Sequence, residues 1–190
     1  MTRLGLALAA FGGVGACGEK GGPTDEPGGP TFESRWDMTV TVRYVKGSSN
    51  LTCDGRDLLG AANPGEYQYR IKAAYGATVK QTESTSYGSV TGTAHTLEPT
   101  EIYDFSNQDW SFNDLQAGQS VALTLSSTEW DGTSKDDYMN GRSNALTLTP
   151  STLRPTGGTS TDRALGVGNS DCGLTLYYDV AIVQRQVATN

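Results

Sequence analysis

The sequence has little positive charge, a single histidine, and no hydrophobic run long enough to cross a membrane. Its 190 residues carry a formal net charge of −7, with 14 lysines and arginines against 21 aspartates and glutamates. Because nucleic-acid-binding proteins present a basic surface, we expect no nucleic-acid partner. No segment approaches the roughly 20 apolar residues of a transmembrane helix. We therefore expect a soluble domain, with any membrane attachment provided by other means.

Sequence motifs of common catalytic and zinc sites are also missing. His95 stands alone, and together with Cys53 and Cys172 it does not supply a zinc site. The chain has no G-x-S-x-G nucleophile elbow that His95 could serve. An acidic chain contains many carboxylate pairs, so pairs of the kind that hydrolyse glycosides carry little information here. We expect a non-enzymatic protein; a hydrolase would rest only on the general ability of folds to host chemistry.

Alternation of apolar and polar residues with a period of two dominates the chain from Trp36 onward. In WDMTVTVRYV, for example, Met38, Val40, Val42 and Tyr44 share one face of a strand. No segment keeps a helical period of 3.6 residues. The predicted strands span residues 37–46, 66–74, 86–96, 100–105 or 108–113, 119–128, 144–149, 162–168 and 173–186. The sequence therefore predicts an all-β fold, an eight-stranded antiparallel β-sandwich with little or no helix.

The first twenty residues combine a positive residue, Arg3, with a short apolar stretch that ends in V-G-A-C, Val14 to Cys17. This arrangement resembles a bacterial lipoprotein signal, in which small residues precede the cysteine that is lipidated. The resemblance implies cleavage before Cys17, lipid on its thiol, and anchoring in the membrane of a bacterial cell envelope. Several acyl chains on one residue would give stable attachment. An ordinary secretory signal with an unrelated cysteine is the alternative.

The segment after the signal consists of Gly, Pro, Thr and charged residues, GEKGGPTDEPGGPT. It has no hydrophobic side chain to bury, so it is predicted to be a flexible linker. The chain thus divides into a signal peptide (1–16), a lipidated cysteine with its linker (17–32), and one β-sandwich domain (33–190).

Export would place Cys53 and Cys172 in an oxidising compartment, where a disulfide between them is the simplest expectation. Two free thiols are the alternative. Strands that alternate in direction would bring residues 47–65, 129–142 and 169–172 to one end of the sandwich and both termini to the other. Both cysteines would then lie at the same end, within reach of each other. Such a disulfide closes a long loop and would contribute about 4–5 kcal/mol in the chain-entropy model.

The stretch TEWDGTSKDDYMNGRS, residues 128–143, is rich in acidic side chains. A solvated polar turn is one interpretation, and a set of oxygen ligands for a cation is the other. Val121, Leu123 and Leu125 alternate with polar residues, and the same alternation places Glu129 and Asp131 on their inward face. Two carboxylates at core positions at the open end of a sandwich favour the cation site.

The order of residues in this stretch resembles the third loop of the C-two domain, a calcium-dependent phospholipid-binding β-sandwich. The matching residues are Glu129, Trp130, Asp131, Ser134, Asp137, Tyr138, Met139 and Gly141. Asp54 corresponds to the first-loop aspartate of the family. The chain departs from the family because Glu129 replaces an aspartate and Asn140 is an extra residue. Gly65 and Glu66 stand where the second first-loop aspartate would be.

The C-two resemblance implies a bound Ca²⁺ at the acidic loops. The implied metal ligands are Asp54, Glu129, Asp131 and Asp137. Asp136 and Glu66 are further candidates. The site would support contact with a membrane, a glycan or a protein, although the scattered arginines after residue 140 form no patch for anionic lipids. The alternative is a metal-independent structural or adhesion lipoprotein that contacts a protein partner.

Overall fold

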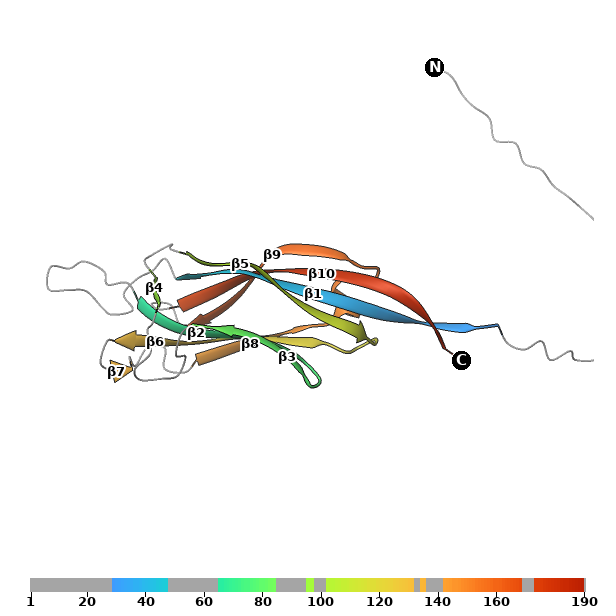
Figure 1. The fold of residues 1–190 in the computed structure, drawn as a ribbon, viewed down its shortest axis with the longest axis horizontal. Helices are drawn as coiled ribbons and strands as arrows, with labels where there is room; N and C mark the ends of the chain where they lie inside the picture. The colour runs from blue at the N-terminus through green and yellow to red at the C-terminus, as the bar shows by residue number, and fades with distance from the viewer. Residues whose placement is uncertain are drawn as a thin grey trace, which may run out of the picture.

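Two antiparallel β-sheets pack face to face in the computed structural model (Figure 1). The structure describes residues 29–47, 65–84, 95–97, 102–131, 134–135, 142–168 and 173–189. The first sheet has the strand order β5 (Ile102–Leu115), β1 (Thr31–Gly47), β10 (Gly173–Thr189) and β9 (Gly158–Gly168). Its two central strands, β1 and β10, are the first and last strands described, so the ends of the domain are joined at its centre.

The second sheet is built around β2 (Gly65–Tyr75) and β6 (Val121–Asp131). One edge of β2 pairs first with β4 (His95–Leu97) and then with β3 (Thr78–Glu83). β8 (Arg142–Leu148) pairs with the other side of β6, and the two-residue β7 (Ser134–Lys135) pairs with the end of β6. Each sheet is thus four strands wide. Together with a single helical turn, α1 (Pro150–Leu153), this confirms the predicted all-β antiparallel sandwich.

Apolar side chains from alternate positions of both sheets fill the space between them. The predicted inward face is confirmed for Met38, Val40 and Val42, whose side chains are buried. It is wrong for Tyr44, because a register shift between Val42 and Tyr44 interrupts the alternation and Val45 is buried instead. The second sheet contributes residues from β2 and β6 to the same core, among them Tyr69 and Leu123. Burial of each such side chain contributes about 1.5–3 kcal/mol relative to its exposed state, so this interior is the main source of stability.

The central strands β1 and β10 extend beyond the sandwich as a two-stranded ribbon (Figure 1). The pairing of β1 with β5 ends at Trp36, and the ribbon continues to the pair Thr31–Thr189. Side-chain bonds support it, because Gln184 and Gln186 each donate to the Ser34 hydroxyl. The predicted strands began at residue 37 and ended at residue 186, so the outer part of the ribbon, residues 31–36 and 187–189, was not predicted. It lies outside the core and is held by polar bonds, so its sequence shows little apolar alternation.

The predicted alternatives 100–105 and 108–113 are parts of one strand, β5. A bulge separates them, in which Ser106 and Asn107 take positive φ angles of 56° and 57°. The Ser106 N–H donates to Asp104 Oδ1 at 2.7 Å. The bulge interrupts the alternation of side chains, so the sequence pattern predicted two short alternative strands where the structure has one.

Strand β3 was missed in the sequence, because most of its side chains are exposed and show no apolar face. It follows β2 through a tight turn at Gly76, whose φ is 54°. Such a positive φ favours glycine. The predicted strand 86–96 falls largely outside the described residues, and only β4 lies at its end.

A charged cluster on the outer face of the first sheet joins β5, β1 and β10. We call it the first bulge cluster: Asp114, Asp37 and Arg185. Asp114 has a positive φ of 62° in a bulge of β5, and its N–H donates to Asp37 Oδ1 at 2.8 Å. Arg185 binds both carboxylates, at 3.1 Å from Asp37 and 2.8 Å from Asp114. These bonds hold the edge strand in its bulged conformation.

The second bulge cluster repeats this arrangement on the opposite edge of the sheet, with Asp162, Asp179 and Arg43. Asp162 has a φ of 53° in a bulge of β9, and its N–H donates to Asp179 Oδ1 at 2.8 Å. Arg43 approaches Asp162 at 2.5 Å and Asp179 at 3.7 Å. Both central strands thus carry an aspartate six positions before an arginine, and each bulged edge is less able to pair with another strand.

Candidate functional site

The strand ends that flank the predicted ligand loops lie together at one end of the sandwich (Figure 1). In the first sheet, Gly47 at the end of β1 pairs with Leu174 near the start of β10. Thr31 and Thr189 pair at the opposite end. In the second sheet, β2 begins and β6 ends on the same side as Gly47. The predicted arrangement of the strand ends is confirmed, and the pair Thr31–Thr189 lies at the opposite end. We call the side of Gly47 the loop end.

Strand β6 ends within the acidic stretch that contains the predicted metal ligands. The burial of its side chains therefore tests which positions of the strand face inward. The side chains that alternate along it, each 0% exposed, are Val121, Leu123, Leu125 and Ser127. The Ser127 hydroxyl donates to the backbone oxygen of Gln68 at 3.2 Å. The predicted inward register is thus confirmed as far as Ser127. Glu129 and Asp131 occupy the next alternate positions of the same strand, opposite Tyr67 and Ser134.

The side chains of Glu129 and Asp131 lie outside the described part of the structure, as do several other predicted site residues. These are Cys17, Cys53, Asp54, Asp137 and Cys172. The calcium ligands, the disulfide and the lipidated cysteine therefore stay predictions. Within the described ranges, no group of three histidine, cysteine, aspartate or glutamate side chains is arranged to hold a metal ion. The same ranges contain no helix with the length and apolar character needed to cross a membrane.

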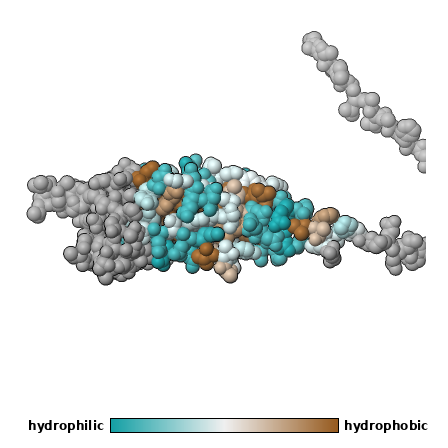
Figure 2. Space-filling model, in the orientation of Figure 1, coloured by the Kyte–Doolittle hydropathy of each residue, from teal (hydrophilic) through white to brown (hydrophobic). Residues whose placement is uncertain are grey.

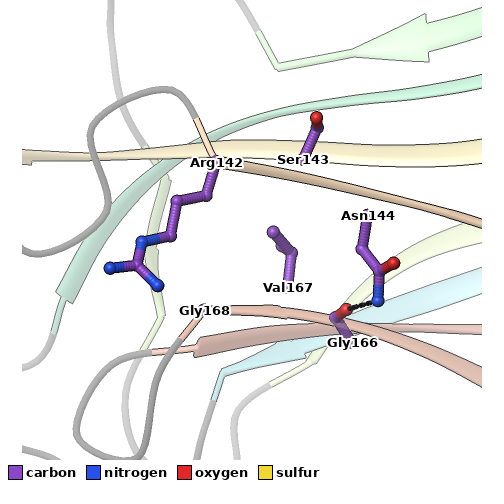
Figure 3. A pocket seen from close by; sticks show the side chains of 6 residues that line it. All are labelled: Arg142, Ser143, Asn144, Gly166, Val167 and Gly168. Atoms are coloured by element: carbon purple, nitrogen blue, oxygen red, sulfur yellow. Dashed lines mark hydrogen bonds between the residues drawn. The ribbon is translucent and has the colours of Figure 1, made fainter.

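A hollow of about 430 Å³ opens between β8 and β9 near the loop end (Figure 3). It is lined by Arg142, Ser143, Asn144, Gly166, Val167 and Gly168. Asn144 Nδ2 donates to the backbone oxygen of Gly166 at 2.8 Å and so joins the edges of the two sheets. The sequence did not reveal this feature, because it forms only where the edge strand of one sheet passes that of the other.

Tyr69 is the described residue whose acidity is most altered. Burial raises the pKa of its phenol far above the ordinary value, and the neighbouring Tyr103 raises this pKa further. Its ring lies 5.9 Å from that of Tyr103 and 5.7 Å from that of Phe105. A phenol that stays protonated inside an aromatic cluster stabilises the core and does not act as a base near neutral pH.

Exposed hydrophobic side chains are few in the described part of the chain. The large ones are Phe32, Val79, Ile102, Tyr103 and Val183. They come from four different strands, and the face shown in Figure 2 is mostly hydrophilic, with its hydrophobic spots apart from one another. The described part of this face thus offers no continuous apolar surface for docking.

Comparison with known proteins gives remote structural similarity only. No protein-family model matches the sequence, and no curated protein matches it. One similar solved structure is a C2 domain protein from Ramazzottius varieornatus, with 11% identity, a TM-score of 0.35, and coverage of 80% of this chain and 91% of that one.

Two further solved structures are similar to the chain at the same level. Human GIVD cytosolic phospholipase A2, in complex with methyl gamma-linolenyl fluorophosphonate, has 17% identity and a TM-score of 0.34, covering 82% of this chain and 18% of the phospholipase. CC2D1B, which acts in the mitotic reformation of the nuclear envelope, has 12% identity and a TM-score of 0.34, covering 85% of this chain and 72% of that one. The fold class of this chain therefore rests on its own strand pairing: it is an all-β antiparallel sandwich.

Proposed function

We propose that the protein is a lipid-anchored component of a bacterial cell envelope, whose C-two-like sandwich binds Ca²⁺ at its loop end. The proposed ligands are Asp54, Glu129, Asp131 and Asp137. The observation that carries the proposal is the register of β6. Alternate positions from Val121 are buried as far as Ser127, and continuing the same count along the strand reaches the acidic residues Glu129 and Asp131. A carboxylate aimed at a sandwich interior is costly unless a cation or hydrogen bonds compensate its charge.

Calcium would supply that compensation. It takes six to eight oxygen ligands at about 2.3–2.6 Å, often from several carboxylates. Asp54 belongs to the segment between β1 and β2, whereas Glu129 and Asp131 belong to β6. A Ca²⁺ ion bound by all three residues would therefore link the segment between β1 and β2 to strand β6 of the second sheet. The bound ion would stiffen the loop end as a surface for a partner, with no catalytic step.

The position of the termini indicates where that partner would be. The chain enters the domain at Thr31, opposite the loop end. The linker before Thr31 spans at most roughly 45 Å if fully extended. A lipid on Cys17 would thus hold the ribbon side of the sandwich toward the anchoring membrane. This orientation favours a protein or glycan beyond that membrane over the anchoring membrane itself.

Titration of the purified protein with Ca²⁺ by isothermal calorimetry is expected to show binding that Asp131→Asn and Asp137→Asn each weaken at least about tenfold. Removing one carboxylate charge and one anionic ligand oxygen from a calcium site lowers its affinity. Asp109→Asn is the matched control, because it makes the same change at a carboxylate of β5 that accepts from the Thr41 hydroxyl at 2.6 Å and is not a candidate ligand. The absence of binding in the unmodified protein, or equal binding in all three variants, would falsify the calcium proposal.

Chelation separates this function from the alternative, a metal-independent structural or adhesion lipoprotein. A calcium-binding sandwich should melt at a lower temperature in the presence of a chelator, since a ligand of the folded state stabilises it. The metal-independent protein should melt at the same temperature with and without chelator. In both cases reductant should lower the melting temperature if Cys53 and Cys172 are joined.

The lipid anchor is expected to depend on one residue. In cells given a labelled fatty acid, the protein should take up the label and sediment with membranes, whereas Cys17→Ser should do neither. Cys17 lies before the sandwich, so the purified variant should melt at the same temperature as the unlipidated domain. Equal labelling of protein and variant would contradict lipidation at Cys17.

A further inference from the structure

The register shift that takes Tyr44 out of the core places it beside a second tyrosine, on the last strand. Tyr44 pairs with Tyr177 across β1 and β10. The next side chains along these strands, Val45 and Tyr178, are completely buried, so the paired tyrosines lie on the outer face of the first sheet. Their rings are stacked, with centroids 4.6 Å apart and planes 21° from parallel. Both tyrosines are partly exposed, so small molecules in solution can reach them.

This is the one stacked contact between two tyrosines among the described residues. Tyr103 is exposed, but its tyrosine neighbour Tyr69 is buried, and their rings are tilted by 53° at 5.9 Å. A further contact holds the stacked pair, because the Arg43 guanidinium carbon lies 5.8 Å from the centre of the Tyr44 ring. Arg43 is itself held by the two aspartates of the second bulge cluster. The two rings therefore meet in a fixed arrangement.

Oxidation can join two phenol rings that are held in contact. A one-electron oxidant takes one electron from each ring, and each phenol releases one proton, which leaves two tyrosyl radicals. The radicals combine by a carbon–carbon bond between ring positions next to the oxygens. The two ring hydrogens at these positions then move to the oxygens and restore the phenols. In total the oxidant accepts two electrons and two protons are released. Neighbours held by a strand pair need no encounter between molecules, so coupling within the pair is favoured.

We propose that Tyr44 and Tyr177 are a site of oxidative modification, at which a diffusible one-electron oxidant joins the two rings as dityrosine. The new bond would link β1 to β10, the first and last strands described. It would stabilise the domain as a disulfide does, by restricting the unfolded chain over the long segment between residues 44 and 177. The site is separate from the proposed calcium ligands and from the cysteines.

Photo-oxidation of the dilute, purified full chain with a ruthenium trisbipyridyl complex and persulfate, in the presence of chelator, is the test. Monomeric protein should gain dityrosine fluorescence. Peptide mapping should find the segments of Tyr44 and Tyr177 joined, with a mass lower by two hydrogen atoms. Tyr44→Phe and Tyr177→Phe should each lower the yield of this fluorescence at least about tenfold, because each keeps the ring and removes the phenol. Tyr103→Phe is the matched control at another exposed tyrosine and should leave the yield unchanged.

The cross-linked monomer should also melt at a higher temperature than Tyr44→Phe treated in the same way, which accounts for oxidation elsewhere in the chain. The proposal would be overturned by the absence of the joined peptides in the monomer. Dityrosine found only in covalent dimers, or a yield that falls equally in Tyr44→Phe and Tyr103→Phe, would overturn it too. Because chelator is present throughout, failure of this test and failure of the calcium proposal are distinguishable.

Discussion

Replacing Leu123 by alanine is expected to lower the free energy of unfolding by about 2–5 kcal/mol. Leu123 lies near the start of β6, between its partners Ala73 on β2 and Leu146 on β8, and its side chain is completely buried. The substitution removes three carbon atoms from the space between the sheets. The closely spaced strands on both sides limit how far the structure can relax into the cavity, so contacts are lost with little compensation.

Chemical denaturation of the protein and the variant measures this effect. Ala122→Ser is the matched control, because residue 122 is adjacent to Leu123 but faces outward and is exposed. That change should alter the unfolding free energy by less than about 0.5 kcal/mol. A loss below about 1 kcal/mol for Leu123→Ala would show that residue 123 does not lie in a close-packed interior.

Asp37→Ala, in the first bulge cluster, should cost about 1–3 kcal/mol of unfolding free energy, more than an ordinary surface ion pair. The Asp37 carboxylate accepts hydrogen bonds from the Asp114 N–H at 2.8 Å and from Arg185 Nε at 3.1 Å. Its removal leaves a bulged backbone amide without its acceptor and releases Arg185 from one of its two acids. Both consequences weaken the attachment of the edge strand β5 to the centre of the sheet.

The loss should depend on pH. Burial alone would raise the pKa of Asp37, but the hydrogen bond from the Asp114 N–H and the interaction with Arg185 together bring this pKa below its ordinary value. A lowered pKa in the folded state means that the contribution is complete above the pKa of the unfolded chain and is lost as the pH falls through the folded pKa. The difference between protein and variant should therefore be largest near neutral pH and shrink in acid.

Two further variants serve as controls for Asp37. Asp179→Ala makes the corresponding change in the second bulge cluster and should destabilise the protein by a similar amount. Asp109→Ala removes a carboxylate of the same sheet face that accepts from the Thr41 hydroxyl at 2.6 Å, and should cost less. If Asp37→Ala and Asp109→Ala destabilise the protein equally, the bulge amide and Arg185 add nothing to the cluster.

Much of the fold could be predicted because alternation along a strand is a local property. Successive side chains point to opposite faces, so a run such as Met38, Val40 and Val42 indicates a strand and its buried side without knowledge of the rest. Alternation does not identify a strand whose side chains are exposed on both faces or whose backbone contains a bulge. β3 has mostly exposed side chains, and the bulge at Ser106 and Asn107 shifts the alternation inside β5.

The candidate calcium site was predictable in part for the same reason. The inward positions of β6 could be counted forward from Val121, and the structure confirms them through Ser127. The count reaches Glu129 and Asp131, whose role as ligands stays a prediction. Asp54 and Asp137 entered through the resemblance to the C-two domain, because a register within one strand cannot identify a ligand from another segment.

The sequence by itself determined the all-β class of the fold and most of the buried faces of β1 and β6. It also determined the end of the sandwich at which the strands that flank the predicted ligand loops end. Tertiary structure alone decided which distant residues meet. Asp37 lies 77 residues from Asp114 and 148 from Arg185, yet the three form one cluster, and Asn144 bonds to Gly166 across the gap between two sheets. The reason is that alternation specifies which face of a strand is buried, whereas the choice of neighbouring strand depends on how all the strands together cover one core.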